Sequence, residues 1–284
     1  MKKVILLTNL ILSLIFISTF VSCNKDDDEN DSGVSVNTVS AKWEISDKNS
    51  PYVSFEFTKD GNYIVVENVS ETNLRSLGTS QKSSSFLKSS SQTMNLRSSN
   101  SESNLSPIHA GTYRIEEDRI ILSGFGLIEV ISITAEEFTF SFTLESTGDT
   151  NSFVAVKSAE PISSSNRTEM FCRTWIAERI TVNGEDMPEE EGMIILFSRA
   201  GTYLILYPPG YEEEAALAEW KWADKEETRI YYSWNNWSEN YEYPIVKIKQ
   251  LDNNNLVLEE IIDDEELLGS DEVLVFTYYL TLKK

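Results

Sequence analysis

Histidine, cysteine and basic side chains are scarce in this sequence, and each shortage excludes a class of function. Among 284 residues there is one histidine, His109, and there are two cysteines. A histidine-rich metal site and most catalytic triads that use histidine as the base are therefore excluded. The chain has 24 Lys and Arg residues against 46 Asp and Glu residues, a net charge of −22. Because this charge repels a polyphosphate backbone, nucleic acid is not expected as a partner.

The rest of the composition is that of a folded protein. Hydrophobic residues make up 40% of the chain and aromatic residues 11%, which is enough for packed cores. At roughly 100–200 residues per domain, the length allows one to three domains.

The first residues of the chain predict export. Two lysines precede residues 4–21, which carry no charge, and Ser22 and Cys23 close this apolar run before an acidic stretch. A basic start, an apolar run and a small residue before the cut are typical of a secretory signal. A retained transmembrane helix is the alternative, because the run is close to the shortest length that spans a bilayer. The cysteine that closes the run favours a signal peptide over residues 1–22.

Residues 20–23, Phe-Val-Ser-Cys, resemble the lipobox of bacterial lipoproteins, although Leu is usual in place of Phe20 and Ala or Gly in place of Ser22. The resemblance implies cleavage before Cys23 and its acylation, for example with palmitate, which anchors a protein without a spanning helix. Lys25-Asp26-Asp27-Asp28 resembles the Lys-acidic export signal of Bacteroidetes lipoproteins. That resemblance implies a lipid-anchored protein on the outer face of the outer membrane. The alternative is that these charges only solvate a flexible acidic tether, expected over residues 23–40.

Lipidation of Cys23 would leave Cys172 without an intramolecular partner. We therefore expect no disulfide, although exported proteins often contain them. Cys172 lies between Phe171 and Trp175 at the expected start of a strand. Packing in a core is favoured there over a role as a nucleophile.

Alternation of apolar and polar residues predicts an all-β fold in two halves. Eight short runs fall within residues 41–158 and eight more within residues 171–284, with a linker at 159–170. Eight antiparallel strands joined by hairpins most simply close into a barrel, so we expect two tandem antiparallel eight-stranded barrels. Two-sheet β-sandwiches are the alternative. The one helix candidate is residues 212–222, which have helical propensity and also read as a loop.

The two halves match in order. Residues 55–66 parallel residues 195–206 as a strand, a turn and a strand that begins with an aromatic residue. Gly61 or Gly201 supplies the positive φ that such a hairpin turn requires. Further along, the stretch that starts at Gly111 parallels the stretch that starts at Glu219.

These motifs resemble the lipocalin-like domains of Bacteroidetes lipoproteins. The matching residues are Lys42-Trp43, Gly61-Asn62-Tyr63, Gly111-Thr112-Tyr113, Thr174-Trp175, Gly201-Thr202-Tyr203, Glu219-Trp220 and the Asn183-Gly184-Glu185 turn. The resemblance covers most of the chain after the tether and implies barrels without shared catalytic residues. Glu219 stands where the family has glycine.

One insertion, at residues 70–106, interrupts the first half. Ser76 to Ser106 contains 13 serines in 31 residues and too few apolar residues for a core, so we expect a disordered loop. Residues 76–106 contain three basic residues, Lys82, Lys88 and Arg97, against one acidic residue, Glu102. The loop could meet the acidic barrels or an anionic partner, or it could simply be a solvated loop.

Three acidic runs, at residues 189–191, 212–214 and 263–266, could suggest a catalytic or calcium-binding site. Each run lies where a loop is expected, and the sequence has no calcium-loop motif, so solvated charge is favoured. Residues 252–255, Asp-Asn-Asn-Asn, read as a hairpin turn. The sequence thus predicts no catalytic residue, no metal site and no cofactor.

Aromatic residues are concentrated in the second half. The candidate ligand-binding residues are Trp220, Trp222, Trp234, Trp237 and Tyr241. Trp220 and Trp222 are two apart and share one face of a strand. Exposed rings beside Asn and Glu suit sugar binding, whereas packing in the core is the alternative.

Together these features predict a surface-anchored lipoprotein with a non-catalytic binding role, for a glycan or a small apolar ligand. One alternative is a structural or protein-interaction subunit of an outer-membrane assembly. A carboxylate-dependent hydrolase is the third possibility, for which no nucleophile, base and orienting group can be placed together from the sequence.

Overall fold

The computed structural model describes residues 33–68, 108–158, 162–211, 214–234, 237, 245–262 and 273–283. Val34–Lys284 belong to one compact unit. The signal peptide, Cys23, the insertion at 70–106, most of the second and all of the third acidic run, and Tyr241 lie outside the described residues. No helix in the described part of the chain is both long and apolar enough to span a membrane.

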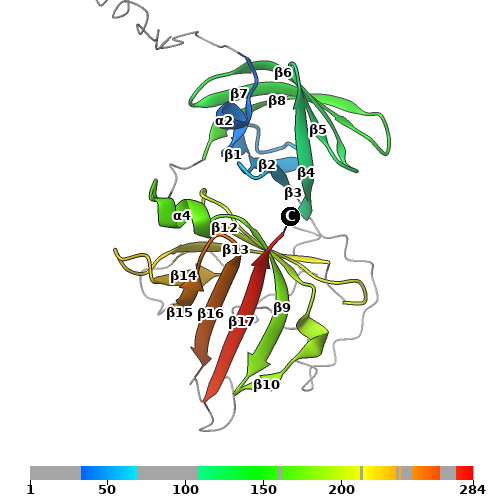
Figure 1. Ribbon diagram of the computed structural model, residues 1–284. Coiled ribbons are helices and arrows are strands. Elements are labelled where there is room, and N and C mark those ends of the chain that lie inside the picture. The colour runs from blue at the N-terminus through cyan, green and yellow to red at the C-terminus, as the bar shows by residue number, and fades with distance from the viewer. Residues whose placement is uncertain are drawn as a thin grey trace, which may run out of the picture. The chain divides into compact units, whose positions relative to one another are not determined.

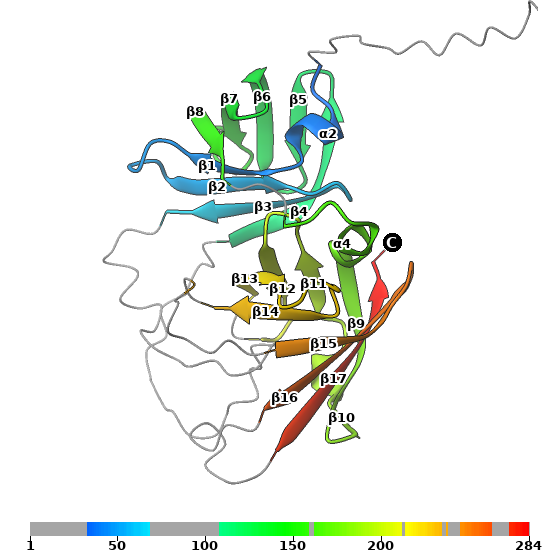
Figure 2. The same cartoon turned by 90° about the vertical axis from the view of Figure 1, so that its left-hand side faces the viewer.

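The first half forms a closed barrel of eight antiparallel strands (Figure 1). Its strands are β1 (Lys42–Ile45), β2 (Tyr52–Phe57), β3 (Asn62–Glu67), β4 (Ile108–Glu116), β5 (Arg119–Leu122), β6 (Gly126–Ile133), β7 (Glu137–Leu144) and β8 (Thr150–Lys157). Each strand pairs with the next, and β8 returns to pair with β1. Figure 2 shows β1 to β4 one beneath the other on one side of this barrel.

The second half closes in the same way, because β17 returns to pair with β9. Its strands are β9 (Thr174–Val182), β11 (Ile194–Phe197), β12 (Thr202–Leu206), β13 (Ala215–Trp222), β14 (Arg229–Ser233), β15 (Ile245–Leu251), β16 (Asn255–Ile262) and β17 (Leu274–Leu282). The two-residue strand β10 (Glu185–Asp186) adds to the edge of β9 (Figure 1). The prediction of two tandem eight-stranded barrels is therefore confirmed over the sandwich alternative.

The helix candidate at residues 212–222 was wrong for the part that is described. Residues 215–222 form strand β13, in which Ala216, Ala218 and Trp220 are buried and their neighbours are not. Burial at every second residue is the period of a strand, and it outweighs the helical propensity of Ala and Glu.

Aromatic side chains fill both barrel cores. In the first barrel, the Phe55 ring lies 5.2 Å from Phe140 and 5.4 Å from Phe142, centroid to centroid, in edge-to-face contacts. In the second barrel, the Phe197 ring stacks on Tyr203 at 5.1 Å. Because such pairs stabilise a core beyond simple burial, the alternating aromatic residues of these strands explain why the interiors pack tightly.

A short helix precedes the first strand of each barrel. These helices are α2 (Val36–Val39) and α4 (Asn166–Phe171), and a 3₁₀ turn, η1 (Pro188–Glu190), lies further along. The last residue of each helix is buried, and its carbonyl accepts a hydrogen bond from the indole N–H of Trp43 or Trp175. The repeat therefore includes a helix that the strand pattern did not predict.

The hairpin turns of the repeat have the predicted geometry. Gly61 has a φ of 82° and Gly201 a φ of 88°. The sequence comparison of the two halves matched Gly111 with Glu219, and the strand register corrects this match by one residue. Gly111 pairs with Tyr63 in the first barrel, whereas Ala218 pairs with the equivalent Tyr203 in the second. Ala218, and not Glu219, thus stands where the first barrel has its glycine.

Candidate functional site at a cleft between the barrels

Four strands are buried on both faces where the barrels meet. In β3, β11 and β12, consecutive residues are buried without alternation, and β2 is buried over its last four residues. The outward-facing Ile64, Leu196 and Leu204 form one buried cluster and are at most 4% exposed. Continuous burial indicates that a second layer covers the outer face of these strands. We call this apolar cluster the seam.

Polar contacts beside the seam join the barrels. The Thr202 hydroxyl donates a hydrogen bond to Oε2 of Glu56 at 2.6 Å. Oδ2 of Asp60 accepts from the hydroxyl of Thr174 at 2.9 Å, and Asn62 donates to the same hydroxyl oxygen at 3.0 Å. Of these hydrogen bonds the one between Thr202 and Glu56 is buried and the two to Thr174 are partly buried, and together they fix how the two surfaces match.

A partly open cleft with a volume of about 350 Å³ lies beside these contacts. The first barrel lines it with Ser40, Glu56, Lys59 and Asp60, among others, and the second with Glu169, Cys172, Arg173, Ser198 and Arg199, among others. The volume is at the lower end of the ~300–1,000 Å³ that is usual for small-molecule sites. The cleft is therefore large enough for a small ligand.

Glu56 is the most deeply buried charged residue of the cleft, with 3% of its surface exposed. Burial raises the pKa of its carboxyl above the usual 4.5, while the hydroxyls of Ser198 and Thr202 and the charge of Lys42 act in the opposite direction. Its second oxygen, Oε1, is buried and has no hydrogen-bond partner among the described residues. A buried oxygen without a partner is costly, and a molecule in the cleft could satisfy it.

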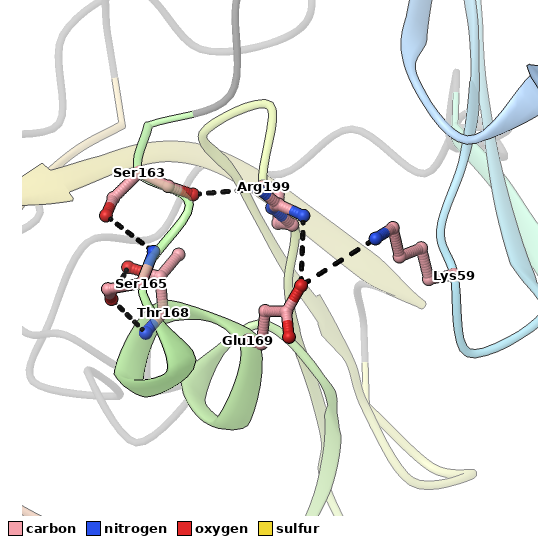
Figure 3. Close-up of polar contacts among 6 residues, drawn as sticks. All are labelled: Lys59, Ser163, Ser165, Thr168, Glu169 and Arg199. Carbon is pink, nitrogen blue, oxygen red and sulfur yellow. Dashed lines mark hydrogen bonds and ion pairs between the residues drawn. The ribbon is translucent and has the colours of Figure 1, made fainter. Parts of the chain in front are cut away.

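Arg199 supplies a second unsatisfied group. Its Nη1 donates to Oε1 of Glu169 at 3.4 Å and its Nη2 to the carbonyl of Ser163 at 3.0 Å (Figure 3). Its Nε is buried and has no acceptor in the described part of the chain. The guanidinium is thus held in place by its tip, while its Nε–H is buried without an acceptor among the described residues.

At the mouth of the cleft, Glu169 connects the two barrels. It lies in the first turn of α4 and pairs with Lys59 of the first barrel, with 3.7 Å between Oε1 and Nζ (Figure 3). The helix is held by its N-cap, because the Ser165 side chain accepts from the backbone N–H of Thr168 at 2.9 Å. About half of each side chain of the Lys59–Glu169 pair is exposed, so the pair contributes little to stability.

Cys172 ends α4 and lines the cleft, and it also packs against the core of the second barrel. Burial raises the pKa of the thiol well above its usual 9.0, although the charge of Arg199 acts to lower it. A neutral thiol is a poor nucleophile. The packing role predicted from the sequence therefore fits the structure, and the position in the cleft was not predicted.

The predicted aromatic residues do not share one face. Trp220 is 1% exposed and lies in the core, and Trp222 packs beside it with its indole N–H donating to the Thr168 hydroxyl at 2.9 Å. The ring of Trp237 instead lies 3.9 Å from Nζ of Lys221. Because adjacent strand residues face opposite ways, the ring beside Lys221 is on the other side of β13 from Trp220.

Trp234 is partly buried, with its ring 5.5 Å from that of Tyr203. Trp220 lies in the core of the second barrel, and Trp222 and Trp234 pack against that core. Tyr241 lies outside the described residues.

Two predictions about loop charge had different outcomes. Glu190 was predicted to be solvated with the rest of its acidic run, but it is 1% exposed, because η1 folds it against the barrel. Asp252 does cap a hairpin turn, as predicted. The backbone N–H of Asn254 is the main cause that lowers the pKa of Asp252 to about 2.

A second buried carboxylate lies inside the second barrel. Glu260 is 1% exposed, and its two oxygens accept from the hydroxyls of Tyr232 at 2.6 Å and Tyr278 at 3.0 Å. Neither Glu56 nor Glu260 was singled out from the sequence. The burial of Glu260 could have been predicted from the sequence, because Glu260 falls on the same alternate positions of β16 as the inward-facing Leu256, Leu258 and Ile262. The burial of Glu56 could not be predicted, because a glutamate on the outward face of a strand normally contacts solvent.

The fold and the cleft define a tandem β-barrel protein with a cleft that both barrels line. No protein-family model matches the chain, and no curated protein matches it. Its function must therefore be inferred from the cleft and the sequence.

Proposed function

We propose that this protein is a surface-anchored lipoprotein that binds a small ligand in the cleft between its barrels and does not chemically change it. The observation that carries the proposal is that two residues lining the cleft, Glu56 of one barrel and Arg199 of the other, each have a buried polar atom without a partner among the described residues, Oε1 and Nε respectively. Leaving a buried polar atom unpaired costs about 1–3 kcal/mol. A ligand that pairs with both atoms would recover this free energy on binding.

The chemistry of the cleft favours binding over catalysis. The Cys172 thiol is neutral, and both oxygens of Asp60 already accept hydrogen bonds, from Thr58 and Thr174. Hydrolysis by carboxylates needs one carboxyl group free to act as a nucleophile or base and another to act as an acid. Of the other two carboxyl groups that line the cleft, Asp60 is engaged at both oxygens and Glu169 pairs through Oε1 with Lys59 and Arg199, which argues against the carboxylate-dependent hydrolase.

The anchor remains part of the proposal. Acyl chains on Cys23 would hold the protein at the outer membrane, and Lys25-Asp26-Asp27-Asp28 supports display on the cell surface. The resemblance to lipocalin-like domains agrees with a binding role. Labelling of cells with an alkyne palmitate analogue should mark the native protein and not a Cys23→Ser variant, and protease added to intact cells should digest it.

Native mass spectrometry of the protein from its own cells tests the binding role. We expect an added mass that is lost on denaturation and is much reduced in an Arg199→Ala variant. Arg114→Ala is the matched control, because Arg114 is exposed on the first barrel and bonds to its neighbour Glu116. No added mass in the native protein, or an equal mass in Arg199→Ala, would count against the cleft as the site.

A role as a protein-interaction subunit is the second candidate. Its support is an outward apolar strip on β8, where Val154 and Val156 are 42% and 43% exposed. Apolar side chains that share an outer strand face can be covered by a partner protein. Cross-linking on cells would support this role if a discrete product forms with the native protein and is lost in a Val154→Ser/Val156→Ser variant.

A further inference from the structure

Most polar groups that line the cleft satisfy one another. Three basic side chains, Lys59, Arg173 and Arg199, balance three acidic ones, Glu56, Asp60 and Glu169. Glu169 forms ion pairs with both Lys59 and Arg199. Asp60 accepts hydrogen bonds from the backbone N–H and the hydroxyl of Thr174. Arg173 donates to the carbonyl of Asn253 at 3.1 Å. Among the described residues, the cleft therefore shows no excess of either charge.

Among the described residues that line the cleft, two buried atoms have no hydrogen-bond partner, and they limit what a ligand must offer. The Nε–H of Arg199 needs an acceptor. Oε1 of Glu56 accepts a hydrogen bond when the carboxyl is ionised and donates one when it is protonated. A hydroxyl group both donates and accepts and can rotate, so it can pair with either form of Glu56 and with Arg199.

Other ligand classes fit less well. An apolar molecule would leave both buried groups unpaired and would therefore recover none of the free energy that pairing them offers. A charged ligand of either sign would find no surplus counter-charge, because three basic and three acidic side chains line the cleft and most of them already pair within the protein.

We propose that the cleft binds a neutral polyhydroxylated molecule of about the size of one sugar ring, held by Glu56 from one barrel and Arg199 from the other. This inference rests on the proposed function and narrows its ligand class. The volume of about 350 Å³ sets the size. Since the two binding groups come from different barrels, the ligand also bridges them.

Ligand-observed NMR on the full-length protein from its own cells tests this inference. The neutral probes are D-glucose, D-galactose, D-mannose and N-acetyl-D-glucosamine, and the charged analogues are D-glucuronate and D-glucosamine. We expect at least one neutral probe to bind, and its charged analogues to bind at least about tenfold more weakly, because each would bury an unpaired charge.

Variants locate the binding. Arg199→Lys keeps the charge but removes Nε–H, and Glu56→Leu removes the carboxyl group, so each should weaken binding at least about tenfold. Glu56→Gln should stay within about threefold, because an amide still donates and accepts. Arg114→Lys, on the surface of the first barrel, should change nothing. If Glu56→Leu does not fold, as judged by circular dichroism, Arg199→Lys carries the test.

The outcomes separate the two proposals. Binding of a charged analogue as tightly as the neutral probes, with loss in Arg199→Lys, would overturn the ligand class and leave the cleft as a binding site. Failure of all four neutral probes at about 10 mM would also overturn the ligand class. The same failure together with no bound cargo in native mass spectrometry would overturn both.

Discussion

The indole N–H of Trp175 donates a hydrogen bond to the carbonyl of Phe171 at 3.1 Å, at the point where α4 leads into β9. In the first barrel Trp43 makes the same bond to Val39 at 2.9 Å, where α2 leads into β1. Both tryptophans and both acceptor residues are at most 1% exposed. Each barrel is therefore joined to its short helix by one buried bond over the same four-residue spacing.

Replacement of this donor should destabilise the barrel that contains it. Trp175→Phe keeps a large ring but leaves the Phe171 carbonyl without its buried donor, which should cost about 1–3 kcal/mol. Urea unfolding followed by circular dichroism measures the loss, and Trp43→Phe should behave alike in the first barrel. Changes below about 0.5 kcal/mol in both variants would show that the bond is not important for stability.

Glycine at the start of β6 should be hard to replace. A Cβ at Gly126 would collide with the Thr143 carbonyl oxygen and the Phe142 ring, so the backbone would have to move. Gly126→Ala should therefore destabilise the protein by about 1–3 kcal/mol in urea unfolding. Gly111→Ala is the comparison and should cost less, because its added Cβ would meet only the Tyr63 ring.

Because the seam holds the two barrels together, we expect them to separate when the apolar contact of Ile64 with Leu196 and Leu204 is broken. Ile64 is 1% exposed and packs with Leu196 and Leu204. Ile64→Asp would bury an unpaired charge there, so the barrels should part while each stays folded. Small-angle X-ray scattering should then show a larger radius of gyration with unchanged circular dichroism. Ile131→Asp is the control, because Ile131 is 63% exposed.

Glu56 predicts how stability responds to pH. Burial raises its pKa in the folded state, so folding favours the protonated form. The contribution of Glu56 to stability is therefore full below its unfolded pKa and is lost as the pH rises through the folded value. Glu56→Gln removes this dependence. Urea unfolding at pH 4 and pH 8 should show the variant gaining stability over the native protein at the higher pH, and an equal difference at both values would contradict the assignment.

The strands of both barrels could be predicted because their inward residues alternate. Phe138, Phe140 and Phe142 of β7 show this pattern clearly in the sequence. The seam could not be predicted, because Ile64 and Glu56 occupy outward positions, and only the second barrel decides that they are buried. The cleft depends on the same contact and was equally hidden.

The aromatic cluster shows the opposite difficulty. Tryptophan suits both a core and a sugar platform, so the spacing of Trp220 and Trp222 could not decide between them. The structure places Trp220 in the core, where it is 1% exposed, whereas Trp222 is only partly buried. A helix such as α2 escapes prediction because four residues are too few for a helical period to show.

The double burial of β2, β3, β11 and β12 has a consequence for the history of the chain. Either half produced alone would expose Ile64 or Leu204 to water, and the first half would also place a carboxylate in a patch shaped for a neighbour. Two barrels whose outer surfaces fit each other in this way cannot be lost or exchanged one at a time without exposing these buried residues. The two barrels are thus inherited as a matched pair, and substitutions on one outer wall should be compensated on the other.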